Sequence, residues 1–158
     1  MKHEIEAMWM GRRRFNALLN GHTVVMDAPE RVGGEDQGSI PKPFVLSALA
    51  GCSGMDVVAL LEKSGCVMDR FDIKVSGELS KGQPMRYISA HAVYDFHGAP
   101  SCEQAAVAAV AKSHKELCGV SAMLQKIMPV SWEVRYNDRV VDTAHLGEPA
   151  PSLAQPAS

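Results

Sequence analysis

Residues 41–58 read PKPFVLSALAGCSGMDVV, and this stretch decides how the rest of the chain has to fold. Its first half is apolar on every face of a helix, so we expect protein to enclose that helix on all sides. Gly51 and Gly54 each cost about 1 kcal/mol against alanine inside a helix, which indicates close approach by another backbone. Gly65 is a good C-terminal stop. The sequence therefore predicts a buried helix from residue 44 to about residue 63.

Alternating apolar and polar residues predict strands on both sides of this helix. Asn20-Gly21 is a strong two-residue hairpin signal between two of them. The expected strands are residues 4–9, 12–19 and 22–27 before the helix and residues 71–79, 88–96 and 130–136 after it. A second helix is expected over residues 101–115, and a short helix that ends at residue 126 follows an interruption around residues 118–121. This order favours an α+β fold with antiparallel sheets around a buried central helix. We expect one domain over residues 1–142 and a loosely ordered Pro/Ala-rich tail over 143–158.

The charge balance argues against several classes of partner. Sixteen Lys and Arg residues oppose eighteen Asp and Glu residues, a net charge of −2, so nothing pulls the chain generally toward nucleic acid or an acidic membrane. The uncharged apolar run over residues 43–55 has 13 residues, whereas a membrane span needs ~20. Residues 1–6 do not begin a secretory signal. We therefore expect no nucleic-acid or membrane partner and a cytoplasmic location.

The four cysteines are Cys52, Cys66, Cys102 and Cys118, and their gaps of 14, 36 and 16 residues contain no close pair. Structural zinc sites favour close pairs, so we expect no metal site. An intracellular chain keeps its cysteines reduced, and Cys66 and Cys102 are interpreted as small buried hydrophobic residues. Cys52 and Cys118 fit that interpretation less well, because each lies beside a glycine where a thiol can be reached.

Two separated motifs, in order, resemble the OsmC/Ohr family of osmotically inducible and organic hydroperoxide resistance proteins. Residues 41–58 resemble the helix with the first family cysteine, and residues 117–124, LCGVSAML, resemble the segment with the second. Residues 21–29, GHTVVMDAP, and 32–35, VGGE, look like the general OsmC-like branch rather than the specialised Ohr peroxidases. The resemblance covers about residues 4–137 and implies an OsmC-like fold in an intertwined homodimer.

The resemblance also implies a two-cysteine mechanism. The Cys52 thiolate attacks the O–O bond of an organic hydroperoxide, and Cys118 then condenses with the resulting sulfenic acid to form a disulfide. A lipoyl group or a small dithiol reduces that disulfide by exchange. No metal, flavin, nucleotide or other cofactor is required. Cys66 and Cys102 are not expected to take part.

The family also uses an arginine to stabilise the first thiolate and a glutamate to hold that arginine. By position the arginine most resembles Arg14, with Arg12 and Arg13 as close competitors. The family glutamate falls at Lys42, which cannot accept the arginine's hydrogen bonds. The resemblance therefore implies weak activity, unless Glu35 or Asp36 in the same loop takes the glutamate's place.

Two other polar residues lie one helical turn from a cysteine. Asp56 follows Cys52 by four positions and either accepts a hydrogen bond or plays a structural part, which we favour. His114 precedes Cys118 by four positions, and its lysine neighbours favour a solvated helix end over a base for the thiol.

The enclosed helix independently favours a homodimer, because one chain of this size with two main helices can hardly cover it. The leading interpretation is thiol-dependent reduction of organic hydroperoxides in oxidative stress defence. The alternative is a non-catalytic OsmC-like module that binds a small apolar ligand at the dimer interface or senses oxidants through its thiols.

Overall fold

The computed structural model describes residues 2–147 of the 158-residue chain. The chain divides into two compact units, residues 1–45 and residues 46–158, where the sequence predicts a single domain over residues 1–142. The last strand runs to Leu146, so regular structure continues beyond residue 143, where the tail was expected to begin. Most of the predicted tail lies outside the described residues.

The first unit is a three-stranded antiparallel sheet of β1 (Glu6–Trp9), β2 (Phe15–Leu19) and β3 (His22–Met26), in that order. Asn20 and Gly21 make the turn between β2 and β3 with φ angles of 49° and 83°. Positive φ at both central residues is what a two-residue hairpin turn requires. The predicted hairpin is therefore confirmed. A short 3₁₀-helix, η1 (Glu30–Val32), follows in the loop before α1.

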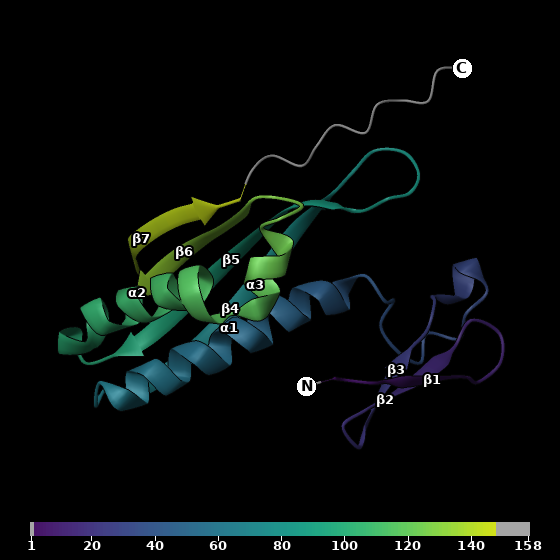
Figure 1. Cartoon of the computed structure of the whole chain (residues 1–158), viewed down its shortest axis with the longest axis horizontal. Helices are drawn as coiled ribbons and strands as arrows, with labels where there is room; N and C mark the ends of the chain where they lie inside the picture. The colour runs from purple at the N-terminus through teal and green to yellow at the C-terminus, as the bar shows by residue number, and fades with distance from the viewer. Residues whose placement is uncertain (1, 148–158) are drawn as a thin grey trace. The chain divides into compact units, whose positions relative to one another are not determined.

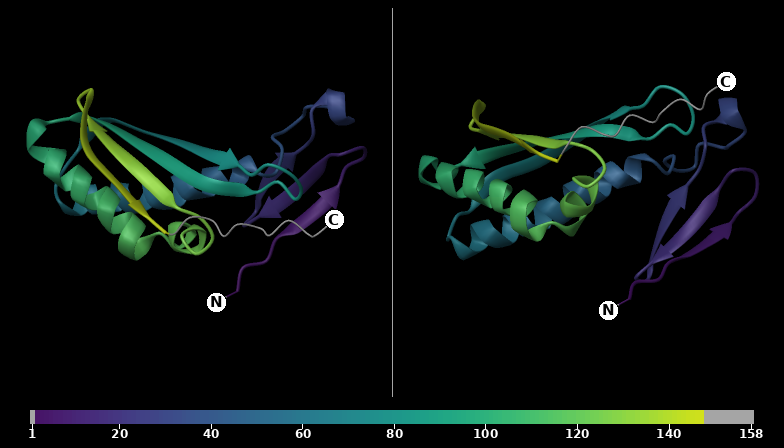
Figure 2. Two further views of the ribbon diagram at one scale, coloured as in Figure 1. Left: turned by 90° about the horizontal axis from the view of Figure 1, so that it is seen from above. Right: turned by 45° about the horizontal axis from the view of Figure 1, so that its top comes forward.

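The second unit contains most of α1 (Pro43–Lys63) and a four-stranded sheet in the order β4-β5-β6-β7. The strands are β4 (Met68–Leu79), β5 (Tyr87–Gly98), β6 (Val130–Tyr136) and β7 (Arg139–Leu146). Between β5 and β6 the chain forms η2 (Pro100–Cys102), α2 (Glu103–Lys112), the π-helix η3 (Ser113–Leu117) and α3 (Gly119–Leu124). Helices α1 and α2 lie side by side on one face of this sheet (Figures 1 and 2).

One pair of neighbouring strands is parallel, which the sequence pattern did not predict. Strands β5 and β6 pair in parallel from Ala90–Val130 to Phe96–Tyr136, whereas the other neighbours pair antiparallel. A parallel pair needs a long crossover connection, and the helical segment from η2 to α3 supplies it. The α+β class with largely antiparallel sheets is confirmed, and β7 is an additional strand.

The core lies between this sheet and the helices. Every second residue is at most 2% exposed over residues 90–96 of β5 and over the whole of β6; these are Ala90, Ala92, Tyr94, Phe96, Val130, Trp132, Val134 and Tyr136. Helix α1 adds Leu49, Val57 and Leu61 from one face. Gly54 lies on that face, where an added Cβ would come within 2.7 Å of Ile73 Cδ1. The glycine thus permits close packing of α1 on β4, but the neighbour is the Ile73 side chain rather than the backbone that the sequence indicated. At Gly51 the expectation is wrong, because an added Cβ would come no closer than 3.9 Å to Met55 Cε.

The opposite side of α1 is open in the single chain. Met55 is 72% exposed and Val58 is 43% exposed. By length and composition alone α1 could cross a membrane, but one of its faces packs on the sheet. Of its most apolar stretch, 28% is buried in the single chain. One chain therefore does not enclose this helix, which is the condition that led us to expect a second copy.

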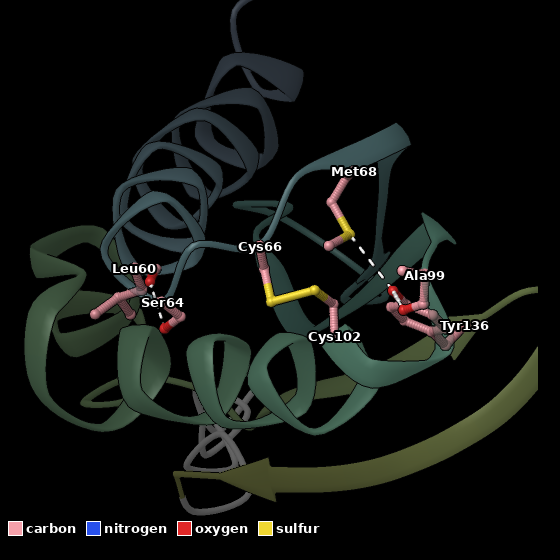
Figure 3. Close-up of a disulfide and its surroundings, with 7 residues drawn as sticks. All are labelled: Leu60, Ser64, Cys66, Met68, Ala99, Cys102 and Tyr136. Atoms are coloured by element: carbon pink, nitrogen blue, oxygen red, sulfur yellow. Dashed lines mark hydrogen bonds between the residues drawn. A yellow bond between two sulfur atoms is a disulfide. The ribbon is translucent and has the colours of Figure 1, made fainter.

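A disulfide joins Cys66 and Cys102, which corrects the interpretation of these residues as reduced buried cysteines (Figure 3). Gly65 ends α1 with φ of +68°, and Cys66 follows it. Cys102 ends η2, at the start of α2. The two Cα atoms lie 5.7 Å apart, within the usual range for a disulfide. A separation of 36 positions carried no sign of this contact, because only the packing of α1 beside α2 creates it.

Candidate functional site

The fold brings Cys52 and Cys118 together although they are 66 positions apart in the sequence. Cys52 lies half-buried on α1, and Cys118 is buried between η3 and α3. Their sulfur atoms and a carboxylate oxygen of Asp56 all lie within 4.8 Å of one another. Neither cysteine is in a disulfide. The arrangement is two thiols within reach of each other, beside one acid.

A change of helix type places Cys118. The chain leaves α2 through the π-helix η3 and turns to extended backbone at Cys118, where φ is −69° and ψ is 103°. The Cys118 N–H donates to the Ser113 carbonyl at 2.8 Å. The Ser121 N–H donates to Cys118 Sγ at 3.3 Å, so the sulfur is the N-cap of α3. Single π-turns are frequent at functional sites, and this one turns the thiol toward α1.

Burial raises the pKa of the Cys118 thiol to about 11, and the nearby Cys52 thiol acts in the same direction. The N–H hydrogen bond from Ser121 works against this rise without cancelling it. Because the thiolate is the reactive form of cysteine, this rise keeps Cys118 as the less reactive, protonated thiol form near pH 7. This suits a residue that acts second.

Asp56 has a specific polar neighbour. It lies one helical turn beyond Cys52 on α1, and the Ser113 hydroxyl donates to its Oδ2 at 3.0 Å. Ser113 is fully buried at the start of η3. The sequence analysis favoured a structural part for Asp56 over a hydrogen-bond acceptor. In the structure its carboxylate accepts a hydrogen bond from the element that leads to Cys118.

His114 is buried at 2% exposure, so the interpretation of this residue as part of a solvated helix end is wrong. Within the π-helix its ring turns inward and stacks on Trp132, with the ring centroids 4.5 Å apart. Its Nε2 lies 2.8 Å from the Tyr94 hydroxyl and its Nδ1 lies 2.8 Å from the Ser121 hydroxyl. Burial lowers the pKa of His114 to about 4, so the ring is neutral near pH 7.

These contacts form a buried polar network that the sequence analysis missed. The Tyr94 hydroxyl also lies 2.6 Å from the Ser53 hydroxyl, next to Cys52. On the other side, the Ser121 hydroxyl bonds His114, and the Ser121 N–H donates to Cys118 Sγ. Burial raises the pKa of Tyr94, so its hydroxyl keeps its proton. The network links the neighbours of both cysteines, and no sequence spacing could reveal it because its members come from α1, β5, η3 and α3.

The first unit holds an arginine–carboxylate pair. Arg14 Nη1 lies 3.5 Å from Glu35 Oε2, and the Arg14 side chain is 29% exposed. Glu35 thus takes the place that the sequence analysis offered to Glu35 or Asp36. Arg12 instead donates to the Gly33 carbonyl at 3.3 Å, and Lys42 is exposed just before α1. Among the three candidate arginines, Arg14 is the one with an ion pair within residues 2–147.

Asp27 fixes the loop that carries Glu35, a role that the sequence analysis did not assign. This residue is 2% exposed. Its carboxylate accepts the N–H groups of Ala28, Glu35 and Gln37 at 2.8, 3.1 and 3.2 Å. Burial alone would raise the pKa of Asp27, but these N–H groups and Arg14 lower it on balance. The carboxylate therefore stays ionised and holds the loop.

An apolar groove of about 640 Å³ runs along α1 from Ala50 to Glu62. It lies between the open side of α1 and strand β4. Its lining residues are Ala50, Gly51, Gly54, Met55, Val58, Ala59, Glu62, Phe71, Asp72 and Ile73. The groove belongs wholly to the second unit and is suited to apolar groups.

A protein-family model described as OsmC-like protein matches residues 34–133, which include both motif cysteines and Glu35. Protein YhfA of Escherichia coli K12 is 28% identical over 117 residues, covering 73% of this chain and 84% of YhfA. An OsmC-like protein from Mycoplasma pneumoniae superposes with a TM-score of 0.73 at 17% identity, covering 86% of this chain and 97% of that one. The organic hydroperoxide resistance protein OsmC from Legionella pneumophila superposes with a TM-score of 0.61 at 17% identity, covering 85% of this chain and 97% of that one.

Proposed function

Because this chain belongs to the OsmC-like protein family, we propose that it reduces organic hydroperoxides with Cys52 and Cys118 as the reacting thiols. The observation that carries the proposal is the approach of the two unbonded thiols, whose sulfurs lie within 4.8 Å. The Legionella structure, named as an organic hydroperoxide resistance protein, adds support at the level of the fold.

The first step is attack by the Cys52 thiolate on one oxygen of the O–O bond. That bond breaks, the alcohol leaves with a proton, and the sulfur becomes a sulfenic acid. The Cys118 thiol then attacks this sulfur, the S–S bond forms, and water leaves with the thiol proton. An external dithiol reduces the new disulfide by thiol–disulfide exchange. The short distance between the sulfurs favours the second step over further oxidation of Cys52.

Arg14 is proposed as the cation that stabilises the Cys52 thiolate, with Glu35 as its holder. The support is the ion pair at 3.5 Å and the family resemblance. A carboxylate orients a guanidinium through parallel hydrogen bonds, and Asp27 fixes the loop of Glu35. In this proposal Glu35 does the work of the family glutamate, whose position Lys42 occupies, so Lys42 by itself does not imply weak activity.

The active form is proposed to be a homodimer in the cytoplasm. Support for the dimer comes from the open side of α1, where Met55 and Val58 remain exposed in one chain. A second copy would remove this apolar surface from water. Cytosolic disulfides are rare, so at that location the Cys66–Cys102 bond would form under oxidative conditions.

The second candidate function is binding of a small apolar ligand without catalysis, and the groove along α1 favours it. Ligand pockets are typically about 300–1,000 Å³ and mainly apolar. The groove volume of about 640 Å³ falls in that range. This candidate predicts ligand binding that does not depend on either thiol.

Consumption of an alkyl hydroperoxide in the presence of a dithiol separates the two candidates. We expect turnover by the wild type and none by Cys52→Ser, because a hydroxyl is far less nucleophilic than a thiolate. Cys66→Ser/Cys102→Ser is the control, since it removes the other two cysteines and leaves no new free thiol, and it should retain turnover. Wild-type turnover no faster than buffer would leave the binding module as the better description.

A further inference from the structure

Three potential metal ligands meet at the candidate site. Within residues 2–147, Cys52, Asp56 and Cys118 place their ligand atoms within 4.8 Å of one another. The close-pair criterion missed this set because two donors come from one turn of α1 and the third from the N-cap of α3. Two thiolates and one carboxylate are a donor set that zinc accepts, and three protein ligands leave a fourth position open.

We propose that the reduced protein binds a thiophilic divalent cation of the Zn²⁺ class through Cys52 Sγ, Cys118 Sγ and the Asp56 carboxylate. Binding releases the thiol protons to solvent and changes no oxidation state. The binding itself requires that both cysteines be reduced, and it does not rest on the proposed function. Its consequence, competition with peroxide for Cys52, rests on the proposed function.

The geometry requires only a small contraction. Tetrahedral zinc with Zn–S of about 2.3 Å and Zn–O of about 2.0 Å separates its ligand atoms by about 3.3–3.8 Å. The three ligand atoms lie within 4.8 Å of one another. Small side-chain movements would therefore bring them to the distances of a zinc site. Cys52 and Asp56 are half-buried, so a cation can approach from their side while Cys118 closes the buried side.

Outer hydrogen bonds hold two of the three ligands. The Ser113 hydroxyl donates to Asp56 Oδ2 at 3.0 Å, which leaves the carboxylate oriented while its other oxygen remains available. The Ser121 N–H donates to Cys118 Sγ at 3.3 Å. Metal sites generally have such outer-shell partners, which orient the ligands.

Other clusters of ligand-type side chains are less suitable. The sulfurs of Cys66 and Cys102 are bonded to each other. His97 lies near Asp95 and Asp138, but the Arg70 guanidinium occupies that cluster, 2.8 Å from His97 Nε2 and 3.1 Å from Asp95 Oδ2. A fixed positive charge there repels a cation.

The test is Zn²⁺ titration of fully reduced protein against a chromogenic chelator, without peroxide. Reduction also opens Cys66–Cys102, so the Cys66→Ser/Cys102→Ser variant is the host in which every thiol belongs to the site. We expect one Zn²⁺ per chain. Cys52→Ser and Cys118→Ser should abolish stoichiometric binding. Asp56→Asn should weaken it by at least about tenfold, and Ser113→Ala by about tenfold, as loss of an outer-shell partner does.

Co²⁺ provides a second readout, because thiolate-to-cobalt charge-transfer absorption appears only when sulfur binds the ion. If the Cys66→Ser/Cys102→Ser host does not fold, the same titration is carried out on the wild type and on Asp56→Asn in the wild-type background. Absence of one-to-one binding, or equal affinity of Asp56→Asn, would overturn the proposed site. Binding of Zn²⁺ by a chain that consumes no peroxide would uphold the site and reject the peroxidase function. Conversely, peroxide turnover without Zn²⁺ binding would reject only the site.

Discussion

Helix α1 and the segment from Pro100 to Leu124 meet at two cysteine pairs, and the surroundings of those pairs differ. Cys66 and Cys102 are bonded and lie against the apolar core between α1, α2 and the sheet. Cys52 and Cys118 are unbonded, with Asp56 and Ser121 beside their sulfurs. We call these the closed pair and the open pair.

The difference teaches that proximity alone does not assign a role to a cysteine pair. The closed pair joins the end of α1 to the start of α2 within the apolar core, which suits a cross-link. The open pair lies beside a carboxylate, a capping N–H and a buried histidine network, which suits chemistry. Each prediction below tests one side of this comparison.

The largest effect is expected at the open pair. Cys118→Ser should lose steady-state turnover, because no thiol remains to condense with the oxidised Cys52. It should still react once and accumulate sulfenic or sulfinic acid at Cys52. Mass spectrometry after one equivalent of alkyl hydroperoxide measures this product. The Cys66→Ser/Cys102→Ser protein is the control and should form the Cys52–Cys118 disulfide. An unmodified Cys52 in Cys118→Ser would contradict the assignment.

Removal of the closed pair should affect stability rather than chemistry. The bond closes a loop over 36 positions, for which loop-closure entropy gives about 4 kcal/mol. We expect Cys66→Ser/Cys102→Ser to lower the free energy of unfolding by up to that amount in urea titrations, with the rate of peroxide reduction per folded molecule retained. An unchanged unfolding midpoint would mean that the closed pair is not a structural cross-link in solution.

The network behind the open pair should make stability depend on pH. The pKa of His114 falls from 6.5 to about 4 on burial, so between these values the unfolded chain binds a proton that the folded chain does not. The contribution of His114 to the free energy of unfolding is then fully present above pH 6.5, and about 3 kcal/mol of it is lost as the pH falls to 4. Urea unfolding at several pH values measures the slope. His114→Gln should flatten it; an identical slope in that variant would show that another group is responsible.

The smallest effect is expected from Lys42. Since Glu35 already pairs with Arg14, Lys42→Glu should change the second-order rate constant with alkyl hydroperoxide by less than about fivefold, the size of an exposed ion-pair effect. Arg14→Ala is the comparison variant and should lower the rate constant. If Arg14→Ala has no effect and Lys42→Glu lowers the rate, Lys42 is the activating cation of the open pair instead.

Local patterns predicted the regular elements well. The Asn20-Gly21 turn, the apolar helix and the alternating strands over residues 71–79, 88–96 and 130–136 are all present, because each depends on neighbours along the chain. Strand β7 was not predicted, and its inclusion depends on pairing with β6. The parallel pairing of β5 and β6 likewise depends on the crossover, which a period-two pattern does not show.

The candidate site was predictable in its members but not in its contacts. The motifs around Cys52 and Cys118 pointed to both cysteines through the family resemblance, and Glu35 was named as one of two possible partners for Arg14. The sequence analysis interpreted Cys66 and Cys102 as reduced residues and His114 as exposed, and both interpretations are wrong. The glycine beside Cys66 and the lysines beside His114 describe only the local chain and not what packs against it. Asp27, Tyr94 and Ser121 carried no signal that separated them from ordinary strand or loop residues.

The amino-acid sequence by itself determined the elements, the family and the two cysteines on which the proposed chemistry depends, since periodicity, turn residues and motifs are properties of consecutive residues. Only the tertiary structure decided which cysteines meet. Cys52 comes within 4.8 Å of Cys118 and Asp56, and Cys66 bonds Cys102, because α1 packs beside the segment between β5 and β6. Such contacts join positions far apart in the chain, and their distances follow from side-chain packing over the whole unit rather than from any local spacing.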